Sequence, residues 1–453
     1  MMRSITLYIT FLLLLTQHAV CKEIFTVEKI GRYLTKENPY VYSAVGQQYV
    51  DEARVQTSMG SFDTKLSSDY EKKEYPLSDG RYLDLTVAKP IENGIEFLAG
   101  YRKAEGVQEY NNIKTGDDGE FRVGVKVPVF ALLNDMNYRK YSVESASFNA
   151  VASKFEAENN LRHLYSSVSV AYYTLLYYSE LFKLEKALLG KAKQRNIFTQ
   201  KRVKSGALPK VALLESEQQI INRKQRLLAT ENSYHNAFKI FLNYLNLPKN
   251  HFDSRYDLPS LSLLKKSTMA FQTALNKALE KRPDLKVLEY KKMKLNLESD
   301  YNTLSKYPDL TVSAYSVHDM RYGSGTKVAF NVNFPLERRG YEGKKIEIQK
   351  GMMQLEEKQN KVKLELKTNL ENLFYSQEVL SENIQNVQEE IKLVEALEEA
   401  ENKKYRVGSS NLFQVNQREM VTLQVKQKKL EYYLNALLIQ QEIKREMGDL
   451  LPR

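Results

Sequence analysis

The 453-residue sequence has no tryptophan, one cysteine, 11 prolines and 19 glycines. The one cysteine, Cys21, lies next to a candidate cleavage point, so neither a disulfide framework nor a thiolate metal site is expected in the mature chain. The scarcity of proline and glycine, with a mean hydropathy of −0.50, favours long helices over several compact domains. After the first 20 residues no stretch approaches the ~20 apolar residues of a membrane helix, so any span in the mature protein must consist of strands.

The polar residues do not form the motifs of common enzymes. The histidines after the N-terminal segment show no His-x-x-Glu-His spacing, and the sequence has neither a phosphate-binding glycine loop nor a Gly-x-Ser-x-Gly elbow. We therefore expect no catalytic residues, metal or cofactor. The formal charge of +11 is spread among glutamates along the helices, which is typical of solvated helix faces rather than a nucleic-acid site.

The N-terminus has the pattern of a secretory signal peptide. Arg3 precedes an apolar run from Ile5 to Leu15, and the segment turns polar at residues 16–18. We predict removal of residues 1–21 ahead of Lys22. The alternative is that Cys21 is the lipid-modified first residue of the mature chain. This alternative is less favoured because Val20, directly before it, is larger than the residue that such processing sites usually have.

Long helical hairpins follow strands in both halves of the chain. Residues 22–247 form the first predicted repeat: a helix, strands within 60–130 and a helical hairpin over 135–247, with leucine, valine and phenylalanine seven residues apart from Leu161 to Leu189. After a linker at 248–264, the second repeat (265–453) has a helix, strands within 308–336 and a hairpin over 341–450. An additional segment, about 71–118, interrupts the strands of the first repeat and carries two strands of its own. It is either an external hairpin that caps the barrel mouth, which its length favours, or a pair of extra strands that widen the barrel.

The strands alternate apolar and polar residues, as in Phe121 to Val129 and Val328 to Phe334. Such strands in an exported chain suit a transmembrane barrel, but four to six strands per chain cannot enclose an open lumen. Several copies must therefore share one barrel, and the long helices must continue from it as a second cylinder. The pattern predicts a conduit.

Several short motifs carry a family resemblance. They are the two-half repeat, Arg282-Pro283-Asp284-Leu285, Tyr307-Pro308, Phe334-Pro335-Leu336 and the Val407-Gly408 hairpin tip. In their order and spacing the chain resembles the TolC-type outer-membrane efflux proteins over nearly all of its mature length. The resemblance implies a mainly α fold with transmembrane β structure: a trimeric channel-tunnel with about four membrane strands per protomer in a shared barrel, and long antiparallel coiled-coil hairpins.

The resemblance also implies a function and partners. The protein would be the exit duct of a tripartite efflux or type I secretion system in the outer membrane of a Gram-negative bacterium, with its helices in the periplasm. Its expected partners are two further copies of itself, outer-membrane lipid, a periplasmic adaptor protein and an inner-membrane transporter of the RND, ABC or MFS type. Two alternatives remain: a periplasmic adaptor, and an exported coiled-coil scaffold without a pore.

The helical tips are the candidate docking sites for the adaptor. By position in the family, the candidates are Val203, Gly206, Ala207 and Leu208 at the first tip, and Arg406, Val407, Gly408, Ser409 and Leu412 at the second. The glycines also permit the turns, since a helix end often needs a left-handed residue. Leu208-Pro209 departs from the small polar residue that many members have there.

The charges near the two tips differ in sign. Basic residues precede Gly206, and acidic residues precede Gly408. We hypothesise that the acidic tip of one hairpin pairs with the basic tip of a neighbour and closes the periplasmic end. Exposed pairs contribute only ~0 to 1 kcal/mol each, so a latch requires several, and solvated faces are the alternative. The candidate gate residues are Glu395, Glu398, Glu399, Glu401, Lys201, Arg202 and Lys204.

Overall fold

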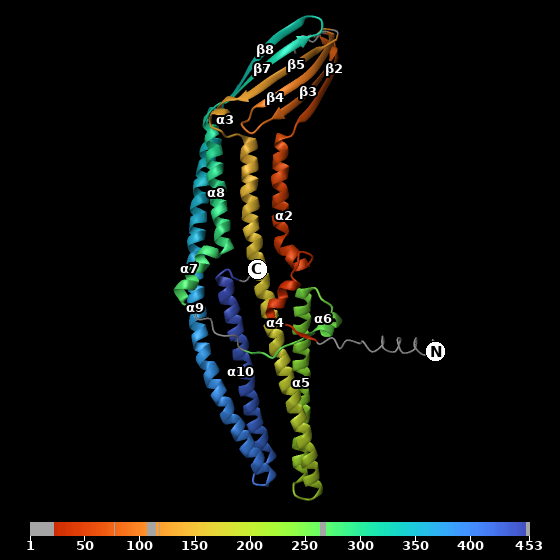
Figure 1. Cartoon of the computed structure of the whole chain (residues 1–453), viewed down its shortest axis with the longest axis vertical. Coiled ribbons are helices and arrows are strands. Elements are labelled where there is room, and N and C mark those ends of the chain that lie inside the picture. Colours follow the sequence, from red (N-terminus) through yellow and green to blue (C-terminus); the bar gives the residue numbers. More distant parts are fainter. Residues whose placement is uncertain (1–21, 77, 107–114, 117, 263–268, 450–453) are drawn as a thin grey trace, which may run out of the picture. The chain divides into compact units, whose positions relative to one another are not determined.

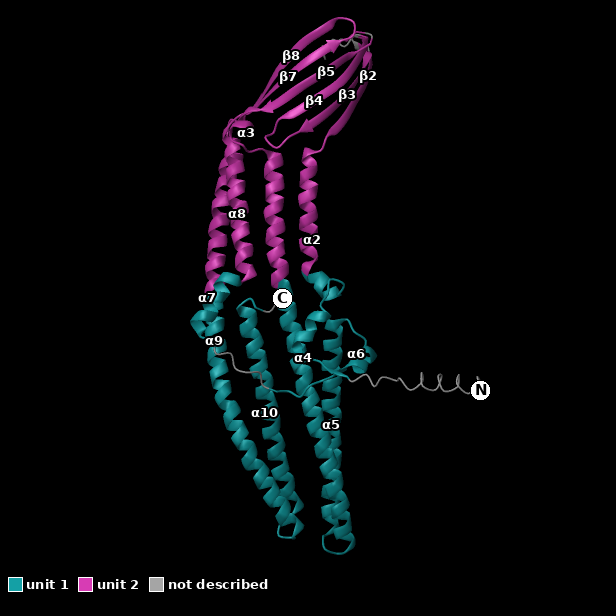
Figure 2. Cartoon of the chain, viewed as in Figure 1, with its two compact units in different colours: residues 1–44, 160–281, 366–453 teal, residues 45–159, 282–365 magenta. Residues whose placement is uncertain are grey.

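The computed structural model describes residues 22–76, 78–106, 115–116, 118–262 and 269–449. The predicted signal peptide and Cys21 lie outside the described residues. The chain divides into two compact units, and each unit draws on both halves of the sequence (Figure 2). Unit 1 comprises residues 1–44, 160–281 and 366–453, and unit 2 comprises residues 45–159 and 282–365.

The same succession of helices occurs in both halves. Two helices of 21 residues, α2 and α8, each begin at a proline and lead through a short 3-10 helix into a strand. Two very long helices of 67 and 68 residues, α4 and α9, are followed by returning helices of 36 and 35 residues, α5 and α10. The bounds are Pro39–Met59 (α2), Tyr138–Lys204 (α4), Lys210–Leu245 (α5), Pro283–Thr303 (α8), Arg339–Arg406 (α9) and Leu412–Glu446 (α10) (Figure 1).

Shorter elements connect these helices. Proline suits the first position of α2 and α8 because its missing N–H has no partner there in any case. Among the described residues, no helix combines the length and apolar composition needed to cross a membrane. The connecting elements are the 3-10 helices Val27–Arg32, Gly60–Phe62 and Leu304–Lys306, and the helices Val129–Leu133 (α3), Lys249–Arg255 (α6) and Phe271–Lys281 (α7).

Unit 2 contains an antiparallel sheet of six strands in the order β2-β3-β4-β5-β7-β8 (Figure 1). Neighbouring strands pair over most of their lengths without interruption of the register. The strands are Lys65–Tyr75 (β2), Ser78–Pro90 (β3), Glu96–Gly106 (β4), Glu120–Pro128 (β5), Asp309–Asp319 (β7) and Gly323–Asn333 (β8).

The six strands lie within the range of four to six that the sequence pattern indicates, and exceed the four or so membrane strands per protomer that the resemblance implies. The segment 71–118, which we expected to form a separate external hairpin, contributes β3 and β4 to the middle of the same sheet. The reason is that β3 and β4 each offer a full set of backbone partners to both neighbours, so the ladder continues through them.

Unit 1 has an aromatic core. The ring of Phe25 lies 5.2 Å from that of Phe252 and 5.0 Å from that of Tyr256, measured between centroids. Both partners belong to the segment predicted as a linker, 248–264. The start of this segment is instead the helix α6 and the strand β6 (Tyr256–Asp257), which pairs in parallel with β1 (Glu23–Ile24). Burial of Phe252 explains the difference, because an aromatic side chain that is 1% exposed anchors its backbone.

The long helices of unit 1 pack through the predicted seven-residue seams. On the first arm Val168 and Leu175 are fully buried, and on the second arm Leu366, Leu370 and Val387 are at most 1% exposed. Side chains repeating at this spacing stay on one helix face, so the seam faces its neighbours along the arm.

Candidate functional site

One face of the six-stranded sheet is apolar and exposed. Successive side chains of a strand point to opposite faces, so alternate residues of all six strands share this face. Leu66 of β2 is 73% exposed, Val123 of β5 is 64% exposed and Phe330 of β8 is 71% exposed. Large apolar side chains exposed together on several neighbouring strands are uncommon on a sheet that faces water, and they indicate apolar surroundings. Further exposed members are Tyr70, Val87, Phe97, Phe121, Val328 and Val332. We call this the apolar face.

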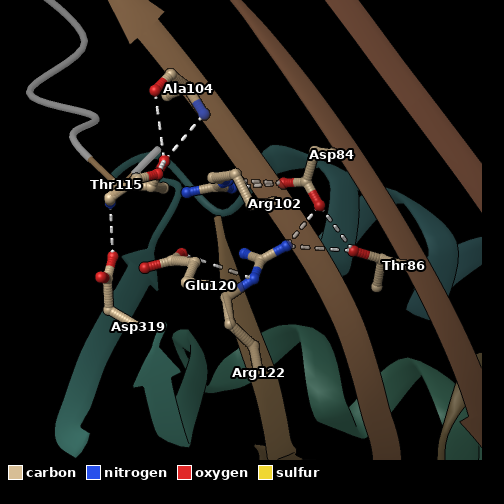
Figure 3. Close-up of polar contacts among 9 residues, drawn as sticks. Asp84, Thr86, Arg102, Ala104, Thr115, Glu120, Arg122 and Asp319 are labelled. Atoms are coloured by element: carbon tan, nitrogen blue, oxygen red, sulfur yellow. Dashed lines mark hydrogen bonds and ion pairs between the residues drawn. The ribbon is translucent and has the colours of Figure 1, made fainter. Parts of the chain in front are cut away.

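The opposite face, here the polar face, carries a charged network. Asp84 of β3 accepts a hydrogen bond of 2.9 Å from Nε of Arg102 on β4, directly across the strand pair, and it also pairs with Arg122 of β5 (Figure 3). The hydroxyl of Thr86 donates to Asp84 at 3.0 Å. The network therefore ties together three neighbouring strands on one side of the sheet.

Gly100 makes this network possible. It lies between Thr86 and Arg122 in the register, so the Arg122 side chain crosses β4 at the one position there without a side chain. A Cβ at residue 100 would lie 3.0 Å from the Thr86 hydroxyl and 2.7 Å from the carbonyl oxygen of Leu85. Gly100 is therefore a requirement of close approach and not of turn geometry.

The two helical tips in unit 1 end in the same backbone motif. At the first tip the N–H of Ala207 donates to the carbonyl of Arg202 at 2.8 Å, and at the second the N–H of Ser409 donates to that of Lys404 at 3.0 Å. The preceding glycines, Gly206 and Gly408, have φ of +75° and +84°. These are Schellman ends, which satisfy the last helix carbonyls.

The predicted docking residues are not equally accessible. Val407 is 81% exposed, whereas Leu412 is 4% exposed and packs against Tyr405 and Val415 inside the second tip. Val203 and Leu208 are partly exposed. The remaining candidates, Gly206, Ala207, Arg406, Gly408 and Ser409, are exposed.

Two predicted gate residues, Glu398 and Arg202, contact the other hairpin within one chain, each through a partner that is not itself a predicted gate residue. Nζ of Lys191 lies 3.3 Å from Oε1 of Glu398, and the Arg202 guanidinium donates to the carbonyl oxygen of Tyr405 at 3.2 Å. Residues of both hairpins line a cavity of about 760 Å³, among them Arg195, Glu398 and Tyr405.

Other predicted gate residues have partners within their own hairpin or lie in solvent. Glu395 pairs with Lys426 at 2.6 Å, and Glu399 pairs with Lys403 at 2.8 Å. Glu401 accepts a hydrogen bond from Ser410. Lys201 and Lys204 are exposed at the end of α4.

A buried charged cluster above the tips was missed by the sequence analysis. Glu419 of α10 is 3% exposed and pairs with Arg195 of α4, while Arg223 of α5 approaches it to 4.0 Å. Glu185 of α4 is 2% exposed and accepts a hydrogen bond of 3.2 Å from Gln427. Helical spacing could have indicated the burial of Glu419, because this residue lies four positions from both Val415 and Leu423 and so shares their buried face.

Two atoms of this cluster lack a hydrogen-bond partner among the described residues: Oε2 of Glu185 and Nη1 of Arg223. Burial raises the pKa of the Glu185 carboxyl, with Arg223 and Arg226 opposing the rise, and burial lowers the pKa of the Arg223 guanidinium. Burial therefore disfavours both charged forms. The contact between the two hairpins therefore contains ionisable groups whose charged forms are disfavoured by burial.

Comparisons with known proteins point to one family. A model of the family described as outer membrane efflux protein matches residues 274–449. No curated protein sequence matches the chain.

Solved structures match nearly the whole chain. The outer membrane protein VceC from Vibrio cholerae has a TM-score of 0.71, with 93% of this chain and 96% of that chain covered. The MtrE outer membrane channel of Neisseria gonorrhoeae, in an open state, has a TM-score of 0.70 with 94% and 89% covered. The CmeC outer membrane channel of Campylobacter jejuni has a TM-score of 0.70 with 93% and 85% covered. Each is 12% identical in sequence, so these matches establish the fold.

The raised pKa of Glu185 predicts a pH dependence of stability. A carboxyl that binds its proton more tightly in the folded state favours folding at low pH, and this contribution is lost as the pH rises from about 4.5 through the higher folded-state pKa. Replacing Glu185 by glutamine keeps an acceptor for Gln427 and removes the charge. We expect E185Q to unfold at a higher temperature than the unmodified protein at pH 7.5, with the difference shrinking toward pH 4.

The control is Glu217→Gln, at an exposed position of α5. Thermal unfolding followed by circular dichroism between pH 4 and pH 8 makes the comparison. Equal midpoints of E185Q and E217Q across this range would show that the buried carboxyl carries no such penalty.

Proposed function

We propose that this chain, whose residues 274–449 match the model of the outer membrane efflux protein family, is a member of that family and the outer-membrane exit duct of an efflux or type I secretion system. It is a passive conduit: three copies form one channel, and substrates reach it from an inner-membrane pump through a periplasmic adaptor. The pump, of RND, ABC or MFS type, selects the substrate, and the duct itself performs no catalysis.

The observation that carries this proposal is the pairing of two kinds of surface in one chain. The sheet has one face with large exposed apolar residues on five of its six strands and a polar face with a charged network. Strands of this type form membrane channels by turning the apolar face to lipid and the polar face to water. In a water-soluble adaptor or scaffold, a residue such as Phe330, which is 71% exposed, would place a large apolar side chain in water.

Outer-membrane location and trimerisation can be tested together. We expect the protein to fractionate with the outer membrane, and to migrate as a trimer on a denaturing gel until the sample is boiled. Resistance to detergent at room temperature is expected because a closed sheet leaves no free edge. A monomer recovered from the soluble periplasmic fraction would contradict the proposal and favour the scaffold or adaptor alternative.

The proposed docking surface for the adaptor lies at the helical tips. Its accessible members are exposed turn residues, and it centres on Val407, whose apolar side chain is 81% exposed. The other accessible members are Gly206, Ala207, Arg406, Gly408 and Ser409. Covering an exposed apolar side chain with a partner's surface removes it from water, which favours association. Leu412 supports the tip from within.

A photo-crosslinking residue at position 407 tests this surface. In intact cells we expect a covalent product with a periplasmic adaptor protein, identified by mass spectrometry. The matched control is position 415, where Val415 is fully buried in the same tip. An adaptor captured from position 415 as efficiently as from position 407, or from neither, would argue against docking at this tip.

The gate proposal takes a definite form at the tips. Lys191 with Glu398, and Arg195 with Glu419, connect the first hairpin to the second within a protomer. The Arg195 pair is buried, so it matters more than exposed pairs do. We propose that these contacts hold the hairpins in the closed arrangement, with Lys201, Lys204 and Glu399 as the exposed charges that a neighbouring copy meets.

Breaking these contacts should open the channel. Removing Arg195 leaves the Glu419 carboxylate buried without its main partner, at a cost of roughly 3–5 kcal/mol. We expect Arg195→Met to raise single-channel conductance, while Lys193→Met, which removes an exposed charge two residues away, leaves it unchanged. The charge reversals Glu398→Lys and Glu401→Lys together should also raise it. If both the Arg195 variant and the double reversal have the same single-channel conductance as the unmodified protein, the proposal that these contacts close the channel is wrong.

A further inference from the structure

The inserted strands carry the same alternation as the rest of the sheet. Following the register from Leu66 of β2 leads to Val87 on β3, Ala99 on β4 and Val123 on β5. All four are exposed members of the apolar face. Since a shift of one residue would move every side chain to the other face, this agreement across β3 and β4 is a property of the whole sheet.

The polar face is also continuous through the insert. Asp84 on β3 and Arg102 on β4 are inserted residues, and they share their ion-pair network with Arg122 on β5. The three side chains are between 11% and 19% exposed. A hairpin that extended away from the sheet would not place its charges against Arg122.

We propose that β3 and β4 are full wall strands in the membrane, so that three copies of this six-stranded sheet close a barrel of eighteen strands. This inference rests on the proposed function and deepens it. It differs from the twelve-stranded barrel that the resemblance implies, and it makes the exit wider.

A second copy of the chain is the occupant that fits the sheet edges. β2 and β8, the two edge strands, each contain 11 residues and run in opposite directions. Within the described residues, their outer backbone groups have no strand partner. An even number of antiparallel strands lets β8 of one copy pair antiparallel with β2 of the next, so that every wall strand has two neighbours and no edge remains.

The register supports closure at a normal tilt. Leu66 is the second residue of β2, and Val332 is the last but one of β8. If β8 of one copy pairs with β2 of the next copy and their ends are level, these two apolar residues lie side by side. Within one copy, by contrast, the register leads from Leu66 across the sheet to Thr326 of β8. The offset of about six residues over six strands corresponds to a tilt of roughly 35°, taking ~3.3 Å per residue and ~4.8 Å between strands. Barrels have tilts of ~35–45°.

The consequence is a wide, water-filled exit. Barrel diameter grows roughly linearly with strand number, so eighteen strands give about one and a half times the diameter of twelve. With the spacing and tilt above, backbones on opposite sides lie on the order of 34 Å apart. Barrels of ~16–18 strands leave an aqueous channel, and the charged polar face lines it.

Spin labels on neighbouring residues distinguish wall strands from an external hairpin. The mature chain is expected to contain no cysteine, so single cysteines can be introduced without background. On β3 the pair is Leu83→Cys, on the apolar face, and Tyr82→Cys, on the polar face. On β4 the pair is Ala99→Cys and Leu98→Cys. The reference pair on β5 is Val125→Cys and Lys126→Cys.

In lipid vesicles, power saturation with oxygen and with a water-soluble nickel chelate measures exposure to lipid and to water. We expect labels at positions 83 and 99 to be accessible to oxygen and shielded from nickel, and labels at 82 and 98 to show the reverse, as at 125 and 126. If only the reference pair alternates and the four inserted positions all contact nickel, this inference is overturned and the proposed function stands. If the reference pair fails to alternate, the proposed function fails as well.

A disulfide tests the closure between copies. In one chain Leu66 and Val332 lie on opposite edges of the six-stranded sheet, roughly 24 Å apart at ~4.8 Å per strand, so a bond between Leu66→Cys and Val332→Cys has to join two copies. Oxidation should yield covalent trimers. The control, Ser67→Cys with Val332→Cys, places the cysteines on opposite faces and should yield none. Absence of trimers from the first pair, or equal yields from both, would overturn the proposed pairing.

Discussion

Hydrogen bonding between neighbouring strands is the interaction on which the rest of this protein depends. Inside a hydrocarbon layer each unpaired backbone N–H or C=O costs several kcal/mol, so a sheet there has to continue until it meets itself. The sheet of this chain ends at β2 and β8. For the proposed membrane channel, oligomerisation therefore follows from the backbone, and the alternation of side chains then assigns one face to lipid and the other to water.

The helical part obeys a different constraint. Its arms bury narrow seams, such as that through Leu366 and Leu370, and leave most of their surface to water. Near the tips the seams include charged residues, and Glu419 is held by Arg195 and Arg223. Buried charge pairs contribute little net stability, but they are sensitive to the loss of one partner. A region of this kind can change its packing without unfolding the arms.

Much of the fold was predictable because its signals are periodic. The hairpins follow from apolar residues seven positions apart, the tip turns from Gly206 and Gly408, and β5 and β8 from strict alternation. The resemblance to outer-membrane efflux proteins, predicted from short motifs, agrees with the model of that family that matches residues 274–449, and the solved structures confirm the fold.

The differences arise where tertiary context outweighs local pattern. β2 extends to Tyr75 through a mostly polar sequence, and its strand structure comes from pairing with β3 rather than from its own composition. The place of β3 and β4 in the sheet is likewise a property of the ladder. In the predicted linker, the sequence does not distinguish Phe252 from the other apolar residues, because its burial depends on tertiary packing. The tip geometry was predictable, but the burial of Glu185 and Arg223 depends on which helix faces which.

The central claim is that this chain, in three copies, encloses a continuous aqueous path. Single-channel recording of the purified protein in a planar lipid bilayer tests it most directly. We predict discrete conductance steps, one for each inserted trimer, whose size falls when polymers small enough to enter the pore are added. Protein that is incorporated into the bilayer as a trimer and passes no current, under conditions that release its tip contacts, would contradict the account.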